Sequence, residues 1–152
     1  MTSNKFFKEK AKKMFKNKKI DIAFIDGLHH YKQVLKDILN CLNYLSDKGV
    51  IIIHDCNPTS QKMQIVPRIQ EEWTGDVWKS IVNLRSFRKD LNIFVINSDY
   101  GTGIIRKGEP ENMLNYSKKK IERMSYKYFN MNRKLLLNLK NIKFLNKFLS
   151  HC

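Results

Sequence analysis

Apolar residues along the chain follow two different periods, and their order predicts a strand, a helix and a second strand. Residues 20–25 form a short β-branched run, IDIAFI, and residues 50–53 form another, VIII. Between these runs, apolar residues recur every three or four positions from Tyr31 to Leu45, which predicts a helix with one apolar face. Asp-Lys-Gly at 47–49 predicts the turn into the second strand.

A helical connection between two strands implies a parallel pair with a right-handed crossover. The carboxyl ends of parallel strands meet at one edge of the sheet, which is where open α/β sheets bind ligands. Asp26 follows the first strand and Asp55 follows the second. Neighbouring strands lie about 5 Å apart, so one hydrated divalent cation could reach both carboxylates.

A second pair of strands is predicted downstream. Residues 91–96, LNIFVI, form a third strand, residues 98–101 form a turn, and residues 102–106 form a fourth strand. The short turn makes this pair an antiparallel hairpin. We therefore expect an α/β fold with two parallel strands, an antiparallel hairpin and flanking helices.

Helical patterns occupy the rest of the chain. We expect a helix over residues 4–16, another beginning at Pro67, which suits a first helical turn, and a third from Val77 towards Phe87. The carboxyl-terminal residues are helical in pattern, with Leu139 among their apolar positions. We expect the sheet and its helices to occupy residues 1–108, and residues 109–152 to form a basic helical extension.

The formal charge of +15 is concentrated at the two ends of the chain. Residues 1–19 carry a net charge of +7 and residues 117–152 carry +9, whereas residues 20–116 carry −1. One interpretation is a basic surface for nucleic acid, an anionic membrane or an acidic partner. The other is a lysine-rich composition that places charge on solvated helices. The second is favoured because no basic motif is interleaved with aromatic residues.

Cysteine usage and hydropathy indicate a cytoplasmic protein. Cys41, Cys56 and Cys152 have no CxxC spacing and cannot all pair, which is typical of a reducing compartment. No run of eighteen apolar residues is present, so we expect no transmembrane helix.

Four segments, in the right order, resemble the second half of a class I S-adenosylmethionine-dependent methyltransferase. They are FIDGLH at 24–29, VIIIHDCNP at 50–58, GDVWK at 75–79 and DYGTG at 99–103. The subfamily they resemble consists of small bacterial methyltransferase-domain proteins with an IDGxH strand end and an HDCxP strand end. The resemblance covers about residues 20–108.

The resemblance implies a partial Rossmann-like methyltransferase sheet, in which the four strands are the fourth to seventh of seven. The first three strands of the family carry the glycine-rich turn and the acidic residue that hold S-adenosylmethionine, and nothing in residues 1–19 resembles them. The residues that bind this cofactor are therefore unknown. The implied activity is methyl transfer to an oxygen or nitrogen of a small molecule or sugar.

Three explanations of the missing half stay open. The chain is a gene fragment, a non-enzymatic remnant, or one subunit whose sheet is completed by a second chain. The third follows from the unpaired side of strand 20–25, which would be a hydrophobic edge.

The resemblance also assigns the metal site. In related metal-dependent O-methyltransferases, acidic residues that end these two strands hold Mg²⁺, which implies that Asp26 and Asp55 are metal ligands. The alternative is that Asp26 caps the following helix and Asp55 bonds loop backbone. Cys56 stands where relatives often carry Asn, and a thiol is a poor Mg²⁺ ligand.

His29 and His54 are the candidate catalytic bases, because imidazole titrates near neutral pH. His29 lies three residues after Asp26, where some relatives place a catalytic histidine. Either histidine could instead be a ligand of a metal softer than Mg²⁺, or be hydrogen-bonded within its loop.

Overall fold

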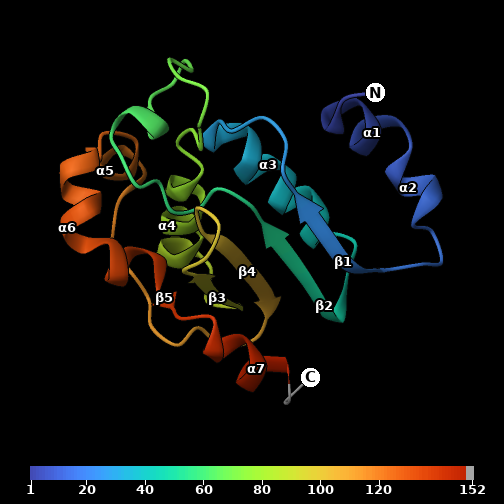
Figure 1. The fold of residues 1–152 in the computed structure, drawn as a ribbon. Coiled ribbons are helices and arrows are strands. Elements are labelled where there is room, and N and C mark those ends of the chain that lie inside the picture. Colours follow the sequence, from blue (N-terminus) through green and yellow to red (C-terminus); the bar gives the residue numbers. More distant parts are fainter. Residues whose placement is uncertain (150–152) are drawn as a thin grey trace.

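The structure is a computed structural model that describes residues 1–149, apart from the side chains of Lys147 and Leu149. It contains a five-stranded sheet in the order β1-β2-β4-β3-β5, with helices on both faces (Figure 1). The elements are α1 Ser3–Glu9, α2 Ala11–Met14, β1 Ile20–Ile25, α3 Tyr31–Leu42, β2 Leu45–Ile53, the 3₁₀ helix η1 Lys62–Gln64, α4 Trp78–Phe87, β3 Leu91–Ile96, β4 Thr102–Lys107, α5 Lys118–Glu122, α6 Tyr126–Leu137, β5 Leu139–Lys140 and α7 Lys143–Leu149. The α/β class is confirmed, including the parallel pair β1–β2 and the antiparallel pair β3–β4.

The unit β1–α3–β2 positions the candidate site. Helix α3 buries Tyr31, Val34 and Ile38 against the sheet, as its three- and four-residue spacing predicts. The backbone N–H at the start of α3, that of Tyr31, donates to the Asp76 carboxylate at 2.7 Å. Asp76 therefore supplies the oxygen that a capping residue would provide.

The start of β2 differs from the prediction. Leu45 belongs to the strand and not to the helix, and the expected turn at 47–49 is an irregular part of β2. The register moves from Ile20 opposite Leu45 to Ile22 opposite Val50, so the extra residues of β2 bulge out. Leu45 is nearly fully buried, and its burial and pairing with β1 outweigh the turn preference of residues 47–49.

Three other expected elements are also corrected. The helix over residues 4–16 is broken at Lys10 into α1 and α2. No helix begins at Pro67, because the chain there folds back on η1, where the N–H of Thr74 donates to the Met63 carbonyl. Leu139 lies in β5, since Asn138 adopts a left-handed conformation (φ 48°) that ends α6 and turns the chain beside β3.

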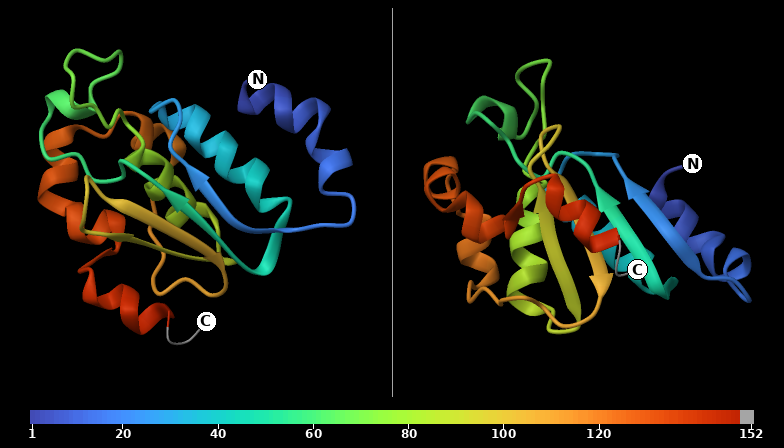
Figure 2. Two further views of the ribbon diagram at one scale, coloured as in Figure 1. Left: turned by 45° about the vertical axis from the view of Figure 1, so that its right-hand side comes forward. Right: turned by 60° about the horizontal axis from the view of Figure 1, so that its bottom comes forward.

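The core has two parts, one on each face of the sheet. Figure 2 shows the helices that cover these two faces. Helices α3, α4, α5 and α6 contribute to the larger part, in which Trp78 packs on Phe129 with ring centroids 4.4 Å apart. Helix α7 covers the other face over β3 and β4, where Phe148 packs 5.2 Å from Phe94. The carboxyl-terminal helices therefore share the core of the sheet.

Strand β1 forms one edge of the sheet, and its outer face carries two exposed apolar side chains. Ile22 is 71% exposed and Phe24 is 62% exposed, whereas Ile25 on the opposite face is 9% exposed. Beyond this edge lie α1 and α2 (Figure 1), in which Phe7 stacks on Tyr44. The helical layer thus continues past the last strand, and no strand of the described residues pairs with the outer side of β1.

Cys41 and Cys56 are buried and unpaired, and Cys152 lies outside the described residues. Among residues 1–149, no helix has the length and apolar character needed to cross a bilayer.

The different environments of Phe24 and Ile25 predict mutational effects of different size. Ile25→Ala should lower the free energy of unfolding by about 2–4 kcal/mol, because a buried side chain leaves a cavity. Phe24→Ala should change it by less than about 1 kcal/mol, because little packing is lost. Urea unfolding followed by far-ultraviolet circular dichroism measures both; an equal loss for Phe24→Ala would mean that this face is covered in solution.

Candidate metal centre

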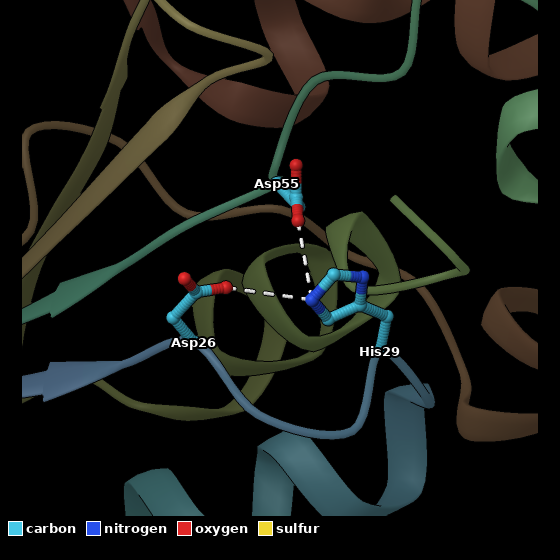
Figure 3. Close-up of side chains that lie close together, drawn as sticks. All are labelled: Asp26, His29 and Asp55. Carbon is cyan, nitrogen blue, oxygen red and sulfur yellow. Dashed lines mark hydrogen bonds and ion pairs between the residues drawn. The ribbon is translucent and has the colours of Figure 1, made fainter. Parts of the chain in front are cut away.

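The structure brings Asp26, His29 and Asp55 together at the carboxyl edge of β1 and β2 (Figure 3). The Nε2 atom of His29 lies 3.4 Å from Oδ1 of Asp26 and 3.2 Å from Oδ2 of Asp55. One ligand atom from each of the three residues lies within 4.8 Å of the others. The parallel pairing thus places both carboxylates at the same edge; their role as metal ligands stays a prediction.

His54 turns its ring towards the same two carboxylates. Its Nδ1 lies 3.4 Å from Oδ2 of Asp55 and 3.8 Å from Oδ1 of Asp26. Its Nε2 lies 3.0 Å from Oδ2 of Asp99, which belongs to the turn between β3 and β4. Both candidate histidines are therefore within reach of the site, and Asp99 joins it from the hairpin.

In each imidazole, the inner nitrogen faces the carboxylates of Asp26 and Asp55 and the outer nitrogen points away from them. The partner of the outer nitrogen determines which of the two carries the proton in the neutral ring. Nδ1 of His29 lies 2.8 Å from the Trp73 carbonyl oxygen, which can only accept, so this nitrogen carries the proton. Likewise Nε2 of His54 donates to the Asp99 carboxylate. In the neutral rings, the inner nitrogens then present lone pairs to the oxygens of Asp26 and Asp55. A proton carried by either the ring or the carboxyl group, or a bound cation, would relieve the repulsion in this arrangement.

The separations fit a cation. Nε2 of His29 lies 3.2 and 3.4 Å from the two carboxylate oxygens, and Asp26, His29 and Asp55 form the group whose ligand atoms all lie within 4.8 Å of one another; His54 stands outside this group. Donor atoms about 2.1 Å from a tetrahedral metal lie about 3.4 Å apart. Histidines that bind metals usually donate their other N–H to a carbonyl or a carboxylate, as His29 and His54 do here. Imidazole donors favour Zn²⁺ or Fe²⁺, whereas carboxylate donors suit Mg²⁺ and Mn²⁺.

Asp55 is held in an uncommon conformation. Its φ is 61°, in the left-handed region that costs a residue with a side chain about 1–2 kcal/mol, and the residue is 6% exposed. Its carboxylate lies against both histidines. The next two residues are bonded to the hairpin turn, since the N–H of Cys56 donates to Gly101 O at 2.9 Å and that of Asn57 to Tyr100 O at 2.6 Å.

Burial and neighbouring charges shift the pKa values of the clustered groups in opposite directions. Burial raises the pKa of Asp55, and the neighbouring His29 and His54 counteract this only in part. Burial alone would lower the pKa of His54, but the hydrogen bond to Asp99 and the charges of Asp55 and Asp26 outweigh it, so this pKa is raised above its ordinary value of 6.5. Each partner thus tunes the proton affinity of the other, as is common at functional sites.

The loop of residues 73–75 supports His29. The imidazole stacks on Trp73 with ring centroids 5.3 Å apart. Gly75 has a positive φ of 58°, and a Cβ atom there would lie 1.8 Å from the His29 carbonyl oxygen. Only glycine fits this contact, so the loop can approach the histidine closely enough for the Trp73 carbonyl to bond its ring.

Several residues named from the sequence have other roles. Helix α3 is capped by Asp76 and not by Asp26, so the capping alternative for Asp26 is wrong. Burial raises the pKa of Cys56, whose thiol is fully enclosed and cannot serve as a nucleophile. The amide of Asn57 is also buried, and both its ends are engaged by Asn97 and Arg133.

Asp99 and the Trp73 carbonyl were missed as site groups. Asp99 approaches because β4 runs antiparallel to β2, with Gly103 opposite Ile53, which brings the turn of the hairpin to the end of β2. The turn motif DYGTG was visible in the sequence, but the pairing partner of β4 was not. A backbone carbonyl has no signal in the residue types.

Comparison with known proteins supports a methyltransferase domain over part of the chain. A family model described as a methyltransferase domain matches residues 1–56, a segment that ends just after Asp55 and includes His29 and His54. No curated protein and no solved structure matches the chain. The methyltransferase resemblance is thus supported over the segment that carries the cluster, and the rest of the fold is established by the structure alone.

The two glycines near the site should respond differently to substitution. Gly75→Ala forces a Cβ atom onto the His29 backbone and a strained φ, so we expect a loss of more than about 2 kcal/mol in the free energy of unfolding. Gly27→Ala is the matched control, because nothing lies within 4 Å of its added Cβ. Thermal unfolding compares them; equal midpoints for the two variants would contradict the close approach of the loops.

Proposed function

We propose that the chain is the carboxyl-terminal half of an S-adenosylmethionine-dependent methyltransferase, and that it acts on a hydroxyl group of a small molecule or sugar with the help of a divalent metal. The observation that carries this proposal is the convergence of two imidazole nitrogens and two carboxylates, within the segment that matches a methyltransferase domain. The family match supports methyl transfer, and the cluster supports metal assistance.

Asp26, His29 and Asp55 would hold the metal. A divalent cation at this position would lower the pKa of an acceptor hydroxyl. His29 suits the role of ligand, because its outer nitrogen donates to a neutral carbonyl, which leaves the inner nitrogen free as a donor to the metal.

His54 is then the base. Its Nε2–H is held by Asp99, so Nδ1 is the nitrogen that can accept a proton. During methyl transfer to the acceptor, the hydroxyl proton would move to Nδ1 of His54. S-adenosylmethionine supplies the methyl group, and the chain orients the acceptor for in-line attack.

A groove next to Asp26 offers space for a ligand. It has a volume of about 550 Å³ and is lined by α1, the end of β1 and α3, with Asn4, Asp26 and Gln33 as polar members. This volume lies in the range of small-molecule sites, about 300–1,000 Å³. We place the cofactor or the acceptor here, in contact with the Asp26 side of the cluster.

The open edge of β1 supports a second chain that completes the sheet. Exposed Ile22 and Phe24 would be covered by a strand beside β1 and the helix that follows it. The projecting helices α1 and α2 would then lie beneath the added strand. On this proposal the glycine-rich half of the cofactor site comes from another polypeptide.

Metal binding tests the cluster directly. Titration of the chain with Mn²⁺ in a calorimeter should show saturable binding of one ion. Asp55→Asn and His29→Gln should each weaken it by at least about 100-fold, because each removes a ligand atom. His30→Gln is the matched control, since His30 contacts Trp73 but not the carboxylates. Equal binding by all four proteins would place the metal elsewhere.

Binding of S-adenosylmethionine tests whether the cofactor site of the isolated chain is incomplete. The isolated chain should bind S-adenosylmethionine weakly or not at all, because one wall of the pocket would come from the absent strands. Calorimetric titration with S-adenosylmethionine, with and without saturating Mn²⁺, measures this. Tight binding in the micromolar range would show that the chain needs no second half.

A further inference from the structure

Helix α6 reaches the loop that follows Asp55 through one residue, Arg133. Its Nη1 donates to Oδ1 of Asn57 and to the Pro58 carbonyl, the latter at 2.7 Å. Its Nη2 donates to Oδ1 of Asn130 at 2.7 Å and to the Tyr126 hydroxyl at 3.3 Å. One guanidinium thus joins α6 to two consecutive residues of the loop at 55–58, which we call the site loop. These residues lie 75 and 76 positions away in the sequence.

The other side of the loop is bonded to the hairpin. The Asn57 side chain donates to Oδ1 of Asn97 at 3.0 Å, and its backbone N–H donates to the Tyr100 carbonyl. Asn57 is therefore held between the end of β3 and α6, and it is 5% exposed. Its amide has a partner at each end, so it has no free oxygen for a ligand.

These hydrogen bonds affect Asp55 because they fix the backbone that follows its left-handed conformation. A left-handed conformation at a residue other than glycine persists where the surrounding structure fixes it. The fixing contacts at Asn57 and Pro58 lie two and three residues after Asp55. A guanidinium can make four such bonds in a fixed plane, and an ammonium group on a flexible chain cannot.

We propose that Arg133 is a positioning residue for the candidate site, which holds residues 55–58 in the conformation that directs the Asp55 carboxylate at His29 and His54. Its effect on ligand binding rests on the proposed metal site. Its effect on the loop does not. On this proposal α6 is part of the site, although the family match ends at residue 56.

Two substitutions at Arg133 separate geometry from charge. Arg133→Met should weaken Mn²⁺ binding roughly tenfold, the scale of losses when an outer partner of a metal ligand is removed. Arg133→Lys keeps the charge but not the planar set of donors, so this variant should bind Mn²⁺ nearly as weakly as Arg133→Met does. Lys134→Met is the matched control, because it removes a neighbouring exposed charge that contacts no part of the loop.

A double-mutant cycle tests whether Arg133 acts through Asn57. If it does, Asn57→Ala and Arg133→Met together should weaken Mn²⁺ binding by clearly less than the product of the two single effects. Full restoration of binding by Arg133→Lys, or independent effects of the two substitutions, would show that charge or general stability is responsible, and the positioning role would be rejected.

Amide hydrogen exchange supplies a readout that needs no metal. In Arg133→Met, the amides of Cys56 and Asn57 should exchange faster than in the wild type, while that of Ile51 in the core of β2 should not. If Arg133→Met does not fold, Asn130→Ala should give a smaller change of the same kind, because Asn130 is exposed and orients the guanidinium.

The two proposals fail in different ways. A wild-type chain without Mn²⁺ binding rejects the metal site, and the exchange of Cys56 and Asn57 then decides the role of Arg133 alone. Normal exchange at these amides in both Arg133→Met and Asn130→Ala would reject that role, whatever the metal result.

Discussion

The candidate site depends on two imidazole rings, those of His29 and His54. In each ring one nitrogen is hydrogen-bonded to a group beside the site, and the other nitrogen faces the carboxylates of Asp26 and Asp55. The Trp73 carbonyl holds the proton of His29 on the outer nitrogen, and the Asp99 carboxylate does the same for His54. The inner nitrogens then face carboxylate oxygens at 3.2–3.8 Å, so positive charge between them, from a proton or a cation, is favourable. Protons can supply this charge in the free protein, and a divalent cation would replace them.

This arrangement follows from the way the strands are joined. The parallel pair β1–β2 brings Asp26 and Asp55 to one edge, and the antiparallel pairing of β4 with β2 brings the turn at Asp99 to the same edge from the other side. The long loop before α4 returns Trp73 to His29. The site therefore combines four segments, each separated from the next by about 18 to 26 residues of sequence.

The sequence predicts those features that depend on local period. Strands β1 and β3 have the predicted bounds, and the parallel connection was enough to place Asp26 beside Asp55. What local pattern could not predict depends on distant partners. The strand assignment of Leu45 comes from its pairing with β1, and Arg133 meets the site loop from 75 residues away. Nothing in the spacing of α6 distinguishes one arginine that bonds a loop from its solvated basic neighbours.

The two carboxylates are held to different degrees, and this asymmetry connects the site to the open edge of the sheet. The side chain of Asp55 is 9% exposed and its loop is bonded on both sides, whereas that of Asp26 is 42% exposed and follows an edge strand. Asp26 also lines the groove between α1 and α3, on the side where β1 has no neighbour among the described residues. A strand added beside β1 would order the end of that strand and enclose the groove. On the proposal of a second chain, completion of the sheet and completion of the site would therefore be the same event, and the more exposed carboxylate would become as fixed as the other.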